Sequence, residues 1–335
     1  MAEATLTKKD FQSDQIVRWC PGCGDYAILA AIQSVMPNLG VPKEKIVFVS
    51  GIGCSSRFPY YMNTYGFHTI HGRAPAIATG LKLSNPDLQV FVVTGDGDGL
   101  SIGGNHLLHV LRRNIDVKIL LFNNKVYGLT KGQYSPTSDL GFKTKSSPMG
   151  SLDQPINPIR IALASEASFV ARTYDANIKH MTETFEKAAA HKGSAFIEIL
   201  QNCVIFNKDV FNDIYERDVR SDHMVHLEEG EPLVFGAESD KGVFLDGFSL
   251  KTGSLEAPPA GQLLTHQPNQ ESPIYANLLA AMEYPQLPLP VGVFRKVPRP
   301  GYEAGVQGQI AQARTKQPDD SLQTLFHSGD TWEVK

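Results

Sequence analysis

Four cysteines are the residues of this 335-residue chain whose type and spacing most directly suggest chemistry. Cys20 and Cys23 form a Cys-x-x-Cys pair in RWCPGCGD, whereas Cys54 and Cys203 are single and distant. A chain of this length buries a core large enough to fold without cross-links, so metal ligation or redox chemistry is favoured over disulfides. Spacing alone leaves three alternatives open: an iron–sulfur cluster, a zinc ion, or unrelated thiols with a thioredoxin-like pair at 20 and 23.

A second candidate site is the segment GDGDG at 95–99. Backbone amides in such a glycine-rich turn can face an anion such as a diphosphate, but Asp96 would repel phosphate unless a cation lay between them. The segment therefore predicts a magnesium ion held by Asp96, the side chain of Asn124 and the main-chain carbonyl of Val126. A simple Gly/Asp turn is the alternative, whereas EF-hand, Rossmann and Walker A patterns do not fit these residues.

These residues can act together only if the fold gathers them. Near-continuous apolar runs alternate with segments typical of helices, which predicts an α/β fold with a doubly wound parallel sheet covered on both faces. The expected strands lie at 45–54, 89–99, 117–124 and 194–203, and the expected helices at 23–36, 75–84, 103–113, 158–168 and 178–191. The carboxyl ends of parallel strands share one edge, so Cys54, Cys203, Asp96 and Asn124 should lie near one another.

Two regions depart from this alternation. Residues 127–158 are rich in Gly, Ser, Thr and Pro, and a loop of that length is typical of a functional segment. Residues 1–205 are predicted to form one domain that carries every candidate site residue. Residues 206–335 are predicted to form an irregular extension that packs on this core or on a partner subunit, with one helical patch at 276–283 and an apolar run, LPLPVGVF.

Composition limits the classes of partner. The chain carries 31 basic and 35 acidic residues, a net charge of -4, which gives no sign of a nucleic-acid footprint. Its polar start and the absence of a long apolar run predict no leader and no membrane span. We therefore expect a soluble, cytoplasmic protein.

The order of six segments resembles a known family. The segments are WCPGCG, GIGCSSR, HGRAPAIATG, GDGDG, NN and LTKGQYSPT, and they match the β subunits of 2-oxoacid:ferredoxin oxidoreductases. The segment VFNDIYERD after Cys203 and the long C-terminal extension look most like the members that act on 2-oxoglutarate. The resemblance covers residues 12–205 and implies the thiamine diphosphate-binding fold. It also implies thiamine diphosphate, magnesium on Asp96 and Asn124, and one 4Fe-4S cluster on all four cysteines. The implied activity is oxidative decarboxylation of 2-oxoglutarate with coenzyme A, with electrons passing to ferredoxin.

The resemblance also implies a cofactor wall. His71 matches the family histidine at the phosphate end of the cofactor. The residues expected to line the cofactor are Ile52, Gly53, Cys54, Ser55, His71, Gly95, Asp96, Gly97, Asp98, Asn124, Val126, Gly128, Leu129 and Thr130. Lys131 and Arg57, together with His71, are the candidate catalytic residues, because either cation could pair with the second carboxylate of 2-oxoglutarate.

One part of the expected machinery has no candidate in this chain. No glutamate stands at a motif matching the residue that activates thiamine, and in the family an α subunit supplies it. We therefore expect an (αβ)2 assembly, with ferredoxin, coenzyme A and a 2-oxoacid as further partners. The alternatives are the same chemistry on pyruvate or another 2-oxoacid, a non-oxidative thiamine enzyme with structural zinc, and a zinc-bound scaffold.

Overall fold

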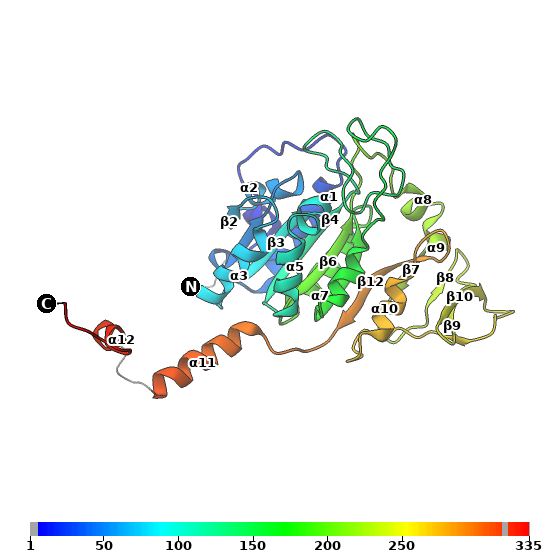
Figure 1. Ribbon diagram of the computed structural model, residues 1–335. Helices are drawn as coiled ribbons and strands as arrows, with labels where there is room; N and C mark the ends of the chain where they lie inside the picture. Colours follow the sequence, from blue (N-terminus) through cyan, green and yellow to red (C-terminus); the bar gives the residue numbers. More distant parts are fainter. Residues whose placement is uncertain (1–5, 317–320, 335) are drawn as a thin grey trace.

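The protein is built around an eight-stranded sheet with helices on both faces (Figure 1). The computed structural model describes residues 6–316 and 321–334. The strand order is β2-β1-β3-β4-β6-β5-β12-β7. The first six of these are mutually parallel: β1 (Ile46–Ser50), β2 (Tyr65–His68), β3 (Gln89–Gly95), β4 (Val117–Asn123), β5 (Phe169–Tyr174) and β6 (Ala195–Leu200). β12 (Leu289–Lys296) runs antiparallel to β5, and β7 (Met224–Leu227) runs parallel to β12.

The central strands are mostly apolar because each faces two cores. In β4, Ile119 and Leu121 pack into one core, whereas Leu120 and Phe122 pack into the other. Successive side chains of a strand point to opposite faces, so a strand buried on both sides favours apolar residues at nearly every position. The helices α1 (Asp25–Val35) and α7 (Ile178–Ala190) cover one face; α3 (Ala74–Ser84), α5 (Gly104–Arg112), α6 (Pro158–Ala164) and α10 (Ile274–Ala280) cover the other.

Short helices complete the chain. The α-helical turns are α2 (Phe58–Tyr61), α4 (Asp96–Leu100), α8 (Asn212–Tyr215) and α9 (Arg220–His223), and the 3-10 turns are η1 (Lys8–Phe11), η2 (Met36–Leu39), η3 (Lys43–Lys45) and η4 (Ser55–Arg57). Asparagine caps begin two of the longer helices. The Asn157 side chain accepts from the Arg160 amide at the start of α6, and Asn177 accepts from the His180 amide at the start of α7. Such caps satisfy amides that the helix itself leaves unpaired.

The predicted fold class is confirmed, and each expected strand and helix of the first 205 residues is present. The sheet is mixed rather than purely parallel, because the chain after residue 205 adds β7 and β12 to it. The extension is thus more regular than the sequence suggested. The run LPLPVGVF overlaps β12, and the patch near 276–283 overlaps α10. A second sheet contains β8 (Val234–Phe235), β9 (Lys241–Asp246), β10 (Ser249–Ser254) and β11 (Gln262–Leu263).

The last described segment leaves the body of the molecule. α11 (Tyr302–Lys316) is anchored at its base, where Glu303 Oε1 accepts from the Asp116 amide at 2.6 Å. Beyond that point α11 and α12 (Leu322–Phe326) extend away from the sheet in Figure 1. None of the helices in the described ranges combines the length and the apolar character needed to cross a bilayer.

A buried ion pair joins β5 to β6 beneath the candidate site. Arg172 Nε lies 2.7 Å from Glu198 Oε2, and both side chains are almost fully buried. We expect Arg172→Met to lower the free energy of unfolding by about 3–5 kcal/mol, because the Glu198 carboxylate would be left buried without a counter-charge. Adding Glu198→Gln should recover part of the loss, since neither charge would then remain. Thermal or urea unfolding of the purified protein measures both variants; equal stability of the two would contradict this explanation.

Candidate functional site

The carboxyl edge of the parallel strands holds the predicted magnesium ligands. β3 ends at Gly95 and β4 at Asn123, and the two strands are directly paired, with Gly95 opposite Phe122. Asp96 and Asn124, the next residues along each strand, therefore project from neighbouring strand ends. Both line the same cavity, together with Val126.

Asp96 is held firmly. Its side chain is 2% exposed, and its Oδ2 accepts hydrogen bonds from Ser135 Oγ at 2.5 Å and Thr137 Oγ1 at 2.6 Å. Burial raises the pKa of this carboxyl to about 6, and the two hydroxyls oppose that shift. Because both hydroxyls contact Oδ2, the oxygen that they leave to a cation is Oδ1.

Asn124 is oriented by two contacts. Its Nδ2 donates to Gln201 Oε1 at 2.8 Å, and its Oδ1 accepts from the Val126 amide at 3.2 Å. Lys125, which lies between Asn124 and Val126 in the sequence, has φ of 55°. This left-handed conformation lets the chain reverse directly after β4. Asp96, Asn124 and Val126 thus line one cavity and offer carboxylate, amide and main-chain carbonyl oxygens, the ligand types that magnesium prefers.

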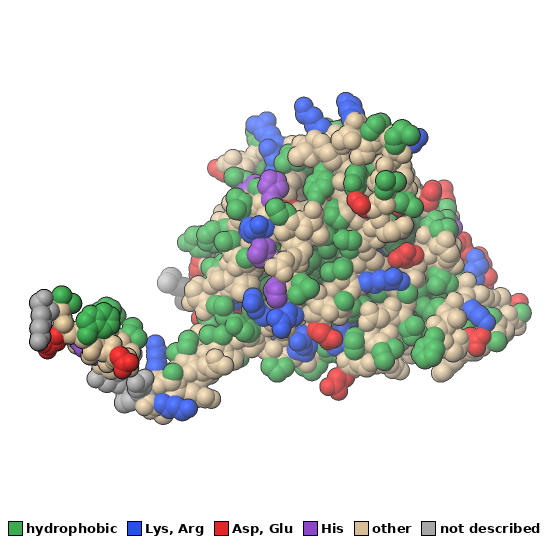
Figure 2. Space-filling view, viewed as in Figure 1, with side chains coloured by type: hydrophobic (Ala, Val, Ile, Leu, Met, Phe, Trp, Pro, Cys, Tyr) green, Lys and Arg blue, Asp and Glu red, His purple; other side chains and the backbone are tan. Residues whose placement is uncertain are grey.

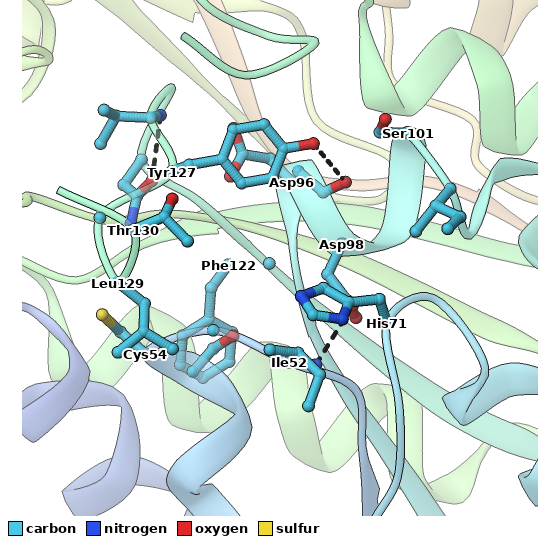
Figure 3. A pocket seen from close by; sticks show the side chains of 18 of the residues that line it. Ile52, Cys54, His71, Asp96, Asp98, Ser101, Phe122, Tyr127, Leu129 and Thr130 are labelled. Atoms are coloured by element: carbon cyan, nitrogen blue, oxygen red, sulfur yellow. Dashed lines mark hydrogen bonds between the residues drawn. The ribbon is translucent and has the colours of Figure 1, made fainter. Parts of the chain in front are cut away.

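The cavity around these residues has a volume of about 160 Å³ and is shown in Figure 3. Every residue predicted for the cofactor wall, from Ile52 to Thr130, lines it. Cys54 and Leu129 lie at one end of the view, and His71 and Asp98 at the other. Five lining residues were not predicted: Asp25, Ser101, Ile102, Phe122 and Tyr127.

Asp98 has a different task from Asp96. Its Oδ1 accepts from the amides of Gly72 at 2.7 Å and Ile52 at 3.1 Å, and its Oδ2 accepts from Thr94 Oγ1 at 2.7 Å. The carboxylate therefore fastens the loops after β1 and β2 to the turn after β3. It lines the cavity, but its oxygens are engaged within the protein.

Gly97 is required by close packing with Tyr127. The Tyr127 hydroxyl donates to the Gly97 carbonyl at 3.0 Å, and a Cβ added at Gly97 would lie 2.1 Å from the tyrosine ring. Any other residue would displace Tyr127 from the cavity wall. The GDGDG segment therefore needs this glycine for packing as well as for approach to an anion.

The four cysteines line a second cavity, of about 280 Å³. It also contains Arg57 and Lys131. A Cβ placed on Gly128 would be 3.6 Å from the sulfur atoms of both Cys54 and Cys203, so these two cysteines, distant in the sequence, approach the same glycine. The two cavities share Cys54, Asn124, Gly128 and Leu129 as lining residues, so they adjoin.

Burial changes the acidity of the thiols. It raises the pKa of Cys54 to about 12 and raises that of Cys23 as well, with the Asp25 carboxyl and neighbouring cysteines adding to both shifts. Gln201 Nε2 donates to Cys23 Sγ at 3.2 Å. Metal ligation requires thiolates, so binding of a metal here would release protons.

Asp25 is the site residue that sequence reasoning missed most clearly. It is 1% exposed, and among the described residues neither carboxylate oxygen has a hydrogen-bond partner. Burial raises its pKa to about 7, and the nearby Asp175 adds to the shift. The sequence feature that could have indicated Asp25 as a site residue is its position two residues after Cys23, in the first turn of α1.

The candidate catalytic residues lie at different places. His71 lines the first cavity and is exposed, whereas Arg57 and Lys131 line the cysteine cavity. Lys131 is exposed and has φ of 75° in the loop 127–158. Lys and Arg side chains project at the top of Figure 2, over the loops at this edge of the sheet.

Comparison with known proteins first defines a class. Residues 51–199 match the family described as thiamine pyrophosphate enzyme, C-terminal TPP binding domain. This range contains β2, β3, β4 and β5 and the turns that carry Asp96 and Asn124. The fold and the match together define a thiamine diphosphate-binding protein.

Two similar curated proteins then define the family. The chain is 53% identical over 329 residues to the 2-oxoglutarate oxidoreductase subunit KorB of Mycobacterium tuberculosis, covering 97% of this chain and 88% of that protein. It is 49% identical over 226 residues to the β subunit of 2-oxoacid:ferredoxin oxidoreductase 1 of Aeropyrum pernix, covering 67% and 70%. The chain belongs to the β subunits of the 2-oxoacid:ferredoxin oxidoreductases, as the resemblance implied.

A solved structure supports this assignment. The 2-oxoglutarate:ferredoxin oxidoreductase from Magnetococcus marinus, with 2-oxoglutarate, coenzyme A and succinyl-CoA bound, matches with a TM-score of 0.75 and 31% identity. The match covers 97% of each chain. The likeness thus includes the C-terminal segment that follows residue 205.

Proposed function

We propose that this chain is the β subunit of a 2-oxoglutarate:ferredoxin oxidoreductase, which reversibly converts 2-oxoglutarate and coenzyme A to succinyl-CoA and CO2 and passes electrons to ferredoxin. The observation that carries the proposal is the shared wall of the two cavities, where Cys54 and Asn124 each line both. A cofactor held in the first cavity would lie directly beside a metal centre held in the second. The substrates bound to the Magnetococcus enzyme favour 2-oxoglutarate.

The first cavity fits thiamine diphosphate and magnesium. Asp96 Oδ1, Asn124 Oδ1 and the Val126 carbonyl would hold the cation, and His71 lies where it can meet the diphosphate. When bound, thiamine diphosphate supplies a carbanion and an electron sink for decarboxylation of a 2-oxoacid. Phe122 and Ile52 give this wall an apolar surface that excludes water from the reacting carbon.

The second cavity fits a 4Fe-4S cluster better than zinc. A tetrahedral zinc site needs four sulfurs at about 2.3 Å from one point. Here the four thiols line a cavity of about 280 Å³. A cubane binds each cysteine at a separate iron and so suits thiols spaced around a wider space. The cluster would accept electrons from the adjoining cavity.

Partners are required for a complete site. No glutamate is present among the described residues that line the thiamine cavity, so the group that activates the aminopyrimidine must come from elsewhere. We assign it to an α subunit in an (αβ)2 assembly. The purified chain alone should therefore be inactive, and activity should appear when the α subunit is added.

Cofactor analysis tests the proposal directly. Anaerobically purified complex should be brown, contain about four irons and four sulfides per β chain, and release thiamine diphosphate on denaturation. It should reduce ferredoxin when 2-oxoglutarate and coenzyme A are present. Zinc in place of iron would overturn the oxidative function, and a preference for pyruvate would overturn the substrate assignment.

Lys131 offers a test of substrate choice. Because its ammonium group lines the cavity beside the shared wall, we expect it to pair with the distal carboxylate of 2-oxoglutarate. Lys131→Ala should raise the KM for 2-oxoglutarate about five- to tenfold, the effect of an exposed charge pair worth on the order of 1 kcal/mol, and should change the KM for pyruvate little. Lys143→Ala, in the same loop but outside both cavities, is the control. Equal effects on both substrates would remove Lys131 from this role.

A further inference from the structure

We propose that Ser135 and Thr137 are positioning residues that set the cation affinity of the thiamine site by fixing the Asp96 carboxylate. The inference rests on the proposed function and concerns a part of the LTKGQYSPT segment to which that function gives no role. Both hydroxyls contact Oδ2 of Asp96, at 2.5 and 2.6 Å. These are the short distances typical of hydroxyl groups that donate to an ionised carboxylate.

A hydrogen-bonded turn over residues 135–138 positions the two hydroxyls. The Ser138 amide donates to the Ser135 carbonyl at 3.1 Å, with Pro136 at the second position of the turn, where its fixed φ is favoured. Ser138 Oγ accepts from the Ser135 amide at 2.8 Å and donates to the Lys125 carbonyl at 2.6 Å. The turn is thus fastened to the end of β4, and both donors are oriented before any cation binds.

A chain of buried polar contacts connects this turn to β4, β6 and β5. Thr137 Oγ1 also lies 2.9 Å from Asn123 Oδ1, and Asn123 Nδ2 donates to Glu198 Oε1 at 2.7 Å. Glu198 is in turn paired with Arg172. All of these side chains are buried. The Thr137 hydroxyl has one proton to donate, and the closer, charged acceptor is Asp96.

This arrangement has two consequences for the site. It fixes the rotation of the Asp96 carboxylate so that Oδ1 faces the cation. The entropy cost of ordering this ligand when the cation binds is therefore lower. It also ties the loop 127–158 to the same carboxylate. Cation binding and the order of the loop that carries Leu129 and Thr130 are therefore linked through Ser135 and Thr137.

The test measures cation affinity without turnover. Mn2+ is titrated into the apo complex at saturating thiamine diphosphate, and free Mn2+ is followed by electron paramagnetic resonance. Thr137→Val and Ser135→Ala should each raise the Kd for Mn2+ about 10- to 100-fold, the usual effect of removing a partner of a metal ligand. Thr137→Ser keeps the hydroxyl and should stay close to wild type.

Ser151→Ala is the matched control. Ser151 is a buried serine of the same loop whose Oγ donates to the Asp139 carbonyl at 2.8 Å, away from Asp96. Unchanged Mn2+ affinity in Thr137→Val, or an equal loss in Ser151→Ala, would overturn the inference. If Thr137→Val does not fold, Ser135→Ala decides. Failure of the wild-type complex to bind Mn2+ with thiamine diphosphate would instead overturn the proposed function.

Discussion

Asp96→Asn is expected to lower thiamine diphosphate affinity and catalytic efficiency by roughly a hundredfold or more, since it removes the one charged ligand of the predicted magnesium site. The variant should nevertheless keep its thermal stability. Burial raises the pKa of Asp96 to about 6, so the ionised carboxylate is less favourable in the folded protein than in the unfolded chain at neutral pH. Calorimetric titration of cofactor and a thermal melt of the cofactor-free complex measure the two effects.

Asp98→Asn is the matched control, because it makes the same chemical change two residues away. Asp98 accepts from two amides and a hydroxyl within the protein. Its neutralisation should lower stability by about 1–3 kcal/mol and weaken cofactor binding less than Asp96→Asn does. If Asp96→Asn instead lost stability and kept cofactor affinity, Asp96 would be a structural residue and the magnesium assignment would fail.

The contrast between the two aspartates shows what the sequence could predict about the site. Asp96 and Asn124 were predictable because they follow apolar strands, and parallel strands bring such residues to one edge. The engagement of Asp98 with Gly72 and Ile52 was not, because it depends on how two loops fold back. Asp25 and Tyr127 were missed for the same reason: the direction of α1 and the path of the loop after β4 place them in the cavity.

The strands of the fold also divide into those that the sequence predicted and those that it did not. β1, β3, β4 and β6 were predicted, although β4 contains Lys118 and β6 contains Glu198, whereas β2 and β5 (FVARTY) were not. The buried Arg172 guanidinium of β5 is paired with Glu198 on β6, a partner that a local pattern cannot reveal. β12 contains Pro290 and Gly292, which argue against a strand in isolation. It is a strand because it packs between β5 and β7.

Cys203→Ser tests the second cavity, and we expect it to abolish electron transfer while thiamine diphosphate still binds. Cys203 lines the cysteine cavity but not the thiamine cavity, so its loss removes one predicted cluster ligand and leaves the Asp96 site intact. The purified complex should lose its broad absorbance near 400 nm and most of its iron, from about four atoms per chain. Reduction of both ferredoxin and a small viologen dye should fall to background.

Val204→Ala is the control, since Val204 lines the same cavity without a ligating atom. It should retain iron, colour and viologen reduction. A Cys203→Ser complex that kept its iron and reduced viologen normally would show that three cysteines and another ligand suffice, or that the metal lies elsewhere. Loss of thiamine diphosphate together with the iron would contradict the expected independence of the two sites and would show that they are coupled through their shared wall of Cys54, Asn124, Gly128 and Leu129.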